Sequence, residues 1–114
     1  MDNLAKLTRQ QRIRLLNDFL RTSFAGGKVM LTAGVDALPA ATKAAVLAKV
    51  QGFKAFNADN DPHGEHDFVN IEHEGKTYFA KIDYYSPDLE GGSEDPADPK
   101  KTTRVLTIMR TDEY

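Results

Sequence analysis

The apolar positions of residues 8–24 recur every three or four residues, which predicts an amphipathic helix. Thr8 and Gln11 have the spacing of a capping box, in which each side chain bonds the backbone of the other residue. The pair Gly26-Gly27 predicts a left-handed stop for this helix. The apolar stripe consists of Ile13, Leu15, Leu16, Phe19, Leu20 and Phe24.

A short β-prone run follows at Lys28–Thr32 and predicts one strand, which ends at Ala33-Gly34. Pro39 then fits the first turn of a second helix, where its missing N–H costs no hydrogen bond. The alanine-rich residues 40–51 continue this helix.

The second half of the chain changes to an alternating pattern. Phe68–His73 and Lys76–Tyr85 alternate with the period of strands, and Glu74-Gly75 between them predicts a compact hairpin turn. Residues 86–101, with three prolines and two glycines, are expected to form a loop. Thr102–Thr111 predicts a buried last strand.

This order, α-β-α-β-β-β, predicts an α+β fold with two helices packed on one face of a mainly antiparallel sheet of about four strands. A length of 114 residues fits one domain, here residues 1–114. The chain contains no cysteine and no apolar run of membrane-spanning length, so we expect a soluble cytoplasmic protein. A homodimer that buries the open sheet face is one option for this architecture.

Charge is segregated along the chain, although the formal net charge is only −2. Residues 1–56 carry nine basic residues against three acidic ones, whereas residues 57–99 carry twelve acidic residues against two lysines. An acidic surface of this kind attracts a basic partner. The isoelectric point near 5.9 makes direct binding of nucleic acid unexpected.

The segment 59–68 concentrates the candidate chemistry. His63 and His66 are interleaved with carboxylates, and imidazole with carboxylate can bind zinc, manganese or iron. The spacing matches no zinc-protease motif. The segment therefore has two alternative interpretations, a metal site at His63 and His66 or a structural turn.

Acid–base catalysis without a cofactor is a further alternative, since Glu65, His66 and Asp67 carry the right groups. In that case His66, His73, Lys81 and the pair Tyr84-Tyr85 could converge across the hairpin. The same alternative describes a small phosphodiesterase-like enzyme.

The acidic residues also suggest a binding surface for a protein with a basic groove. On this interpretation the protein is not an enzyme and needs no cofactor. The candidate partner-binding residues are Asp59, Asp61, Asp88, Glu90, Glu94, Asp95 and Asp98.

Four motifs follow one another along the chain: Asn60–Phe68, Lys81–Tyr85, Asp95–Pro99 and Thr103–Met109. With these motifs the chain resembles the bacterial family catalogued as domain of unknown function 3768, with a likeness from about Ile13 to Tyr114. An aromatic residue commonly stands in that family where this chain has His63, which weakens a ligand role for His63.

The resemblance implies no agreed activity and no catalytic residue. It does imply a small accessory protein carried by mobile DNA, near genes that blunt host defence. We therefore expect an inhibitor of a nucleic-acid-handling defence complex, of the anti-restriction or anti-CRISPR type. This expectation rests on analogy of context alone.

Overall fold

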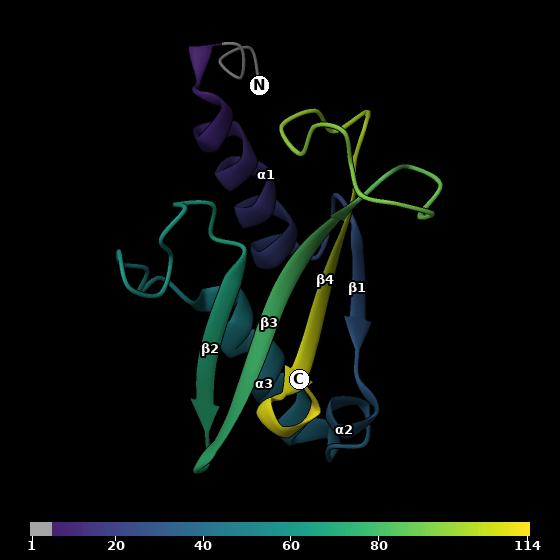
Figure 1. Cartoon of the computed structure of the whole chain (residues 1–114). Coiled ribbons are helices and arrows are strands. Elements are labelled where there is room, and N and C mark those ends of the chain that lie inside the picture. The colour runs from purple at the N-terminus through teal and green to yellow at the C-terminus, as the bar shows by residue number, and fades with distance from the viewer. Residues whose placement is uncertain (1–5) are drawn as a thin grey trace.

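A computed structural model describes residues 6–114 of the chain (Figure 1). Its sheet has four strands, and the predicted α+β class is confirmed. The elements are α1 (Arg9–Ser23), β1 (Lys28–Leu31), α2 (Ala33–Asp36), α3 (Ala40–Gly52), β2 (Phe68–His73), β3 (Lys76–Tyr85), β4 (Thr103–Arg110) and the 3-10 turn η2 (Thr111–Glu113).

The strands lie in the order β1-β4-β3-β2. The pairs β2–β3 and β3–β4 are antiparallel, whereas β1 is parallel to β4. The sheet is thus mainly antiparallel, as predicted, with one parallel pair at its β1 edge. The hairpin turn is also as predicted, since Glu74 and Gly75 both have positive φ angles, 52° and 78°.

α1 and α3 cover one face of the sheet (Figure 1). The core between these helices and the sheet is built from buried side chains of both. The even-numbered residues of β3 and β4 face this core. The largest of these fully buried side chains are Tyr78, Ile13, Leu20, Leu106 and Ile108. Within residues 6–114 no helix combines the length and the apolar character needed to cross a bilayer.

α1 begins as predicted but differs from the prediction at its end and on its buried face. Thr8 forms the capping box with Gln11. The left-handed stop is Phe24, with φ 59°, rather than Gly26-Gly27. Leu15 and Phe19 are 42% and 55% exposed. Both residues were expected on the buried face of α1. That face instead includes Asn17 and Arg21.

α2 is a single helical turn that the sequence did not predict. The predicted stop of the first strand, Ala33-Gly34, is in fact the start of this turn. Glu113 at the end of the chain stabilises it, because its carboxylate accepts hydrogen bonds from the Thr32 hydroxyl at 2.7 Å and the Gly34 N–H at 2.8 Å. The turn therefore depends on a residue that lies about eighty positions further on.

Candidate functional site

His66 is enclosed by two carboxylates and an aromatic ring. Its Nδ1 lies 2.8 Å from Asp18 of α1, and its Nε2 lies 3.5 Å from Asp61. The imidazole stacks on Phe56 with ring centres 3.7 Å apart and planes within 4° of parallel. Asp61 also accepts the backbone N–H of His66 at 3.1 Å and thereby supports the left-handed backbone there, with φ 55°.

Arg21 of α1 joins this cluster to the end of α3. Its Nη1 donates to the carbonyl oxygens of Val50, Gln51 and Phe53 at 3.0 to 3.1 Å. These carbonyls lie at a helix C-terminus, where they lack partners within the helix and carry partial negative charge. Its Nη2 contacts Asp18 at 3.2 Å. The buried guanidinium thus fixes the carboxylate that holds His66.

A second chain of hydrogen bonds runs from Glu65 into the core. The Tyr84 hydroxyl donates to Glu65 at 2.8 Å and accepts from the Asn17 side chain at 2.7 Å. Asn17 also donates to the Glu65 carbonyl at 3.0 Å, and its own oxygen accepts from Arg104 Nε at 2.8 Å. Arg104 further donates to the Pro96 carbonyl. Asn17, fully buried, therefore has its polar atoms satisfied.

Burial dominates the electrostatics of this region. It raises the pKa of Asp67, and the nearby carboxylates of Glu65 and Asp61 raise it further. Burial also raises the pKa of the Tyr84 hydroxyl and lowers the pKa of the Arg104 guanidinium. Each shift disfavours the charged form of its group, as expected where water is partly excluded.

The polar groups of the cluster are directed at protein partners. A catalytic base needs a ring nitrogen within reach of the substrate proton. Both nitrogens of His66 face carboxylates, and one face of the ring lies against Phe56. The Glu65 carboxylate is likewise held by Tyr84. The geometry is that of a network which holds residues 61–67 against α1 and α3.

The expected convergence of His73 and Lys81 on His66 is wrong. His73 pairs with Lys76 at the hairpin end of β2, and about 16 Å of strand separates it from Phe68. Lys81 contacts Asp83 at 2.7 Å on the sheet face away from the helices. The Lys81 side chain therefore lies on the face opposite Tyr84 and cannot meet the cluster, whereas Tyr84 does reach it through Glu65.

The predicted metal ligands are not part of a larger ligand set. His63 is exposed, and its backbone carbonyl accepts a hydrogen bond from Gln10. Across residues 6–114 there is no group of three or more histidine, aspartate or glutamate side chains arranged to hold a metal ion.

The predicted partner-binding acids fall into different environments. The prediction is wrong for Asp61, because its side chain is only 6% exposed and contacts His66. Asp95 pairs with Arg9 at 3.3 Å and, like Asp98, bonds a backbone N–H of its own loop. The remaining members, Asp59, Asp88, Glu90 and Glu94, are exposed.

The two acidic segments do not form one continuous surface. Residues 57–67 and the loop of residues 86–101 lie on opposite sides of α1 (Figure 1), and Gln10 and Arg9 contact one segment each. Asp88 bonds Ser86 within the loop. Within residues 6–114 the carboxylates of Glu90 and Glu94 make no hydrogen bond or ion pair. The 86–101 loop thus presents two unengaged negative charges.

Sequence reasoning did not single out Asn17, Asp18, Arg21 and Arg104, which build most of the polar network, or Phe56, which stacks on His66. A signal for two of them was present. Asn17 and Arg21 lie four and eight residues after Ile13, so they fall on the apolar stripe of α1. A polar residue inside such a stripe indicates a buried partner, because burial without one is costly.

The comparisons with known proteins identify a family but no characterised relative. A family model described as "Protein of unknown function (DUF3768)" matches residues 31–113. The match begins at the end of β1, so α1 lies outside it, although the predicted likeness began at about Ile13. No curated protein and no solved structure matches the chain. Because this family model matches most of the length of the chain, the chain belongs to the DUF3768 family.

Proposed function

We propose that the protein is a small non-enzymatic binding module that docks the acidic loop of residues 86–101 onto a basic surface of another protein. The observation that carries this proposal is the contrast between two sets of polar residues. The side chains of Asp61, Glu65 and His66 are turned inward and bond within this segment or to Asp18 and Tyr84. Glu90 and Glu94 are exposed, and their side chains have no partner within residues 6–114.

Unengaged charges on an exposed loop steer a partner of opposite sign. The loop itself is well braced, since the Ser93 hydroxyl bonds both Lys101 and Thr102 and the Ala97 side chain is buried. A braced loop loses little conformational entropy on binding, which favours recognition.

The alternative, an enzyme centred on Glu65, His66 and Asp67, receives no specific support. An enzyme of this type needs a base that faces a substrate. Here His66 Nδ1 and one oxygen of Glu65 already make hydrogen bonds, and His66 Nε2 lies 3.5 Å from Asp61. The same contacts are what a structural role requires.

Two further expectations concern the cellular location of the protein and the kind of complex that it binds. A cytoplasmic location follows from the composition described above, and action as an inhibitor of a nucleic-acid-handling defence complex follows from the family resemblance; both stay predictions. The binding proposal does not depend on it.

The test uses the double variant Glu90→Lys/Glu94→Lys, which leaves the bonded acids of the loop in place. The variant Asp36→Lys/Glu74→Lys is the matched control, because it changes the same charge at two exposed acids on other parts of the molecule. Each protein serves as bait in a bacterial lysate, and a retained protein is purified and titrated calorimetrically at two salt concentrations.

The proposal predicts a one-to-one complex with the wild-type and control proteins that weakens at high salt. The loop variant is expected to bind at least about tenfold more weakly at low salt. Equal affinity of the loop variant and the wild type would contradict the proposal. So would binding that salt does not affect.

A further inference from the structure

β2 is an edge strand whose outer side carries unpaired backbone groups. It ends the sheet, with β3 on one side only. The Ile82 N–H donates to the Asp67 carbonyl, and the register continues from there, so Val69, Ile71 and His73 exchange hydrogen bonds with β3. The N–H and C=O groups of Phe68, Asn70 and Glu72 therefore point away from the sheet.

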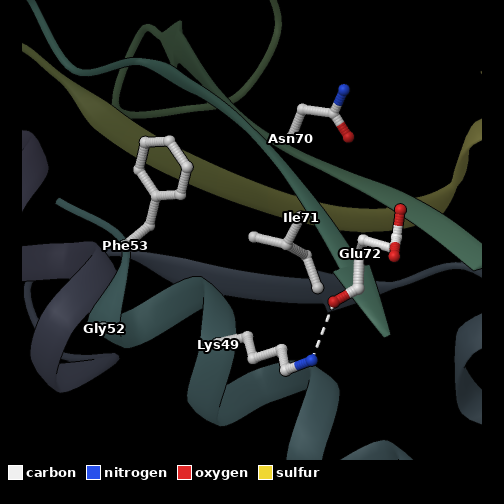
Figure 2. A pocket seen from close by; sticks show the side chains of 6 residues that line it. All are labelled: Lys49, Gly52, Phe53, Asn70, Ile71 and Glu72. Atoms are coloured by element: carbon white, nitrogen blue, oxygen red, sulfur yellow. Dashed lines mark hydrogen bonds between the residues drawn. The ribbon is translucent and has the colours of Figure 1, made fainter. Parts of the chain in front are cut away.

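Little in residues 6–114 protects this edge. Natural edge strands are commonly blocked by proline, by lysine or by a covering segment. β2 contains neither residue type. Its one outward group with a partner is the Glu72 carbonyl, which accepts from Lys49 Nζ of α3 at 2.8 Å (Figure 2). Within residues 6–114 the outward groups of Phe68 and Asn70 have no such partner.

A groove runs beside this edge, between β2 and the end of α3. A shallow, open concavity of about 410 Å³ is lined by Lys49, Gly52, Phe53, Asn70, Ile71 and Glu72 (Figure 2). A second one, of about 320 Å³, continues along the strand past Phe68 and is walled by Asp59 and Asn60. Phe53 and Asn70 line both. Space above Gly52 is open, since a Cβ added there meets no atom within 4 Å.

We propose that this edge binds an extended peptide segment of a partner protein as a fifth strand, with alternating apolar and basic side chains. Backbone hydrogen bonds to Phe68 and Asn70 would supply the pairing, as in other cases of strand addition. The proposal goes beyond the acidic loop and does not depend on it, because the two surfaces share no residue.

The side chains of the peptide follow from the two faces of the added strand. On the helix side they meet Phe53 and Ile71 above Gly52, an apolar floor that favours residues such as valine. On the other side they lie beside Phe68, Asn70 and Glu72, which project away from the helices. Glu72 on this face and Asp59 at the rim are exposed carboxylates, whereas Lys49 is engaged, so the local charge favours basic residues.

The test titrates the full chain with the acetylated and amidated peptide Lys-Val-Lys-Val-Lys-Val, followed by NMR of the backbone amides. Saturable binding is expected, with the Asn70 amide among those that shift and become protected from hydrogen exchange. A peptide with glutamate in place of lysine is expected to bind about threefold more weakly. A peptide methylated at alternate amide nitrogens, which cannot pair, is expected not to bind.

Two variants test the groove itself. Gly52→Gln fills the open space and is expected to weaken binding at least about tenfold. Gly91→Gln is the matched control, because a side chain there also meets no atom within 4 Å but lies far from β2, and it should bind like the wild type. Asn70→Pro removes one outward N–H, at a position where an edge strand tolerates proline, and should also weaken binding. Thermal melting checks that each variant folds.

The outcomes separate this proposal from its rivals. No saturable binding up to about 1 mM peptide, or unchanged affinity in Gly52→Gln, would overturn it. Sedimentation of the wild type that shows a dimer broken by Asn70→Pro would assign the edge to a second copy of the chain instead. Glu90→Lys/Glu94→Lys should leave peptide binding intact, so failure of the acidic-loop proposal can be recognised separately.

Discussion

Replacing His66 by alanine tests whether the Glu65–His66–Asp67 cluster holds the fold. The imidazole is 80% buried, since 20% of the side chain is exposed. Loss of its stack on Phe56 removes about 0.5–1.5 kcal/mol. Loss of the contact with Asp18, a carboxylate that is about a third exposed, removes roughly 1–2 kcal/mol after allowance for screening by solvent.

His66→Ala also removes one of the two contacts that offset the burial of the Asp61 carboxylate. This carboxylate is 6% exposed and keeps only the hydrogen bond from the backbone N–H of residue 66. In total we expect His66→Ala to lower the free energy of unfolding by about 2–4 kcal/mol. For a chain of this length that corresponds to a fall in Tm on the order of 10 °C.

Urea unfolding followed by circular dichroism measures the change, with His63→Ala as the control. His63 lies three residues earlier in the same segment but is exposed, so its replacement should change stability by less than about 0.5 kcal/mol. A double-mutant cycle of His66→Ala with Phe56→Leu isolates the stacking contribution. If His66→Ala proves as stable as His63→Ala, the structural reasoning is refuted and the enzyme alternative regains weight.

Three further variants follow from the same network and from one close backbone contact. Asp67→Asn should stabilise the protein at pH 7: the folded pKa is raised above its usual 3.8, so the stability that Asp67 contributes is present below pH 3.8 and is lost as the pH rises through the folded pKa. Urea titrations should show this advantage at pH 7 and its disappearance near pH 3. Tyr84→Phe should cost about 1–2 kcal/mol by calorimetry, because it removes the hydroxyl shared by Asn17 and Glu65, whereas Tyr85→Phe, at an exposed ring, should be nearly neutral. Gly27→Ala should cost about 1–3 kcal/mol, because its Cβ would lie 2.6 Å from the Arg104 carbonyl oxygen, and an unchanged Tm would contradict this account.

Much of the candidate site could be located from the sequence, but its internal arrangement could not. The density of acids and histidines singled out residues 59–68, and the structure places His66 and Glu65 in a polar network there. The partners of these residues, Asp18 and Tyr84, lie 48 and 19 positions away. Composition of one segment carries no information on which distant side chains will face it.

The same limit applies to the acidic residues. Asp61 and Glu94 look alike in the sequence, yet one side chain is buried against His66 and the other is exposed. The difference arises because residues 61–67 pack against α1, whereas the 86–101 loop projects beyond the sheet (Figure 1). Only the buried polar side chains of residues 61–67 lost contact with water on folding and therefore needed protein partners.

What the sequence by itself determined is the local structure: the helices, the hairpin at Glu74-Gly75 and the capping box at Thr8. These features depend on contacts within a few residues, so periodicity and turn chemistry specify them. The tertiary structure alone decided the parallel pairing of β1 with β4, the turn α2 and the partners of the buried Asn17 and Arg21. Each of these depends on partners distant in the chain, such as Arg104, which is 87 positions from Asn17 and meets it only when the sheet and α1 pack together.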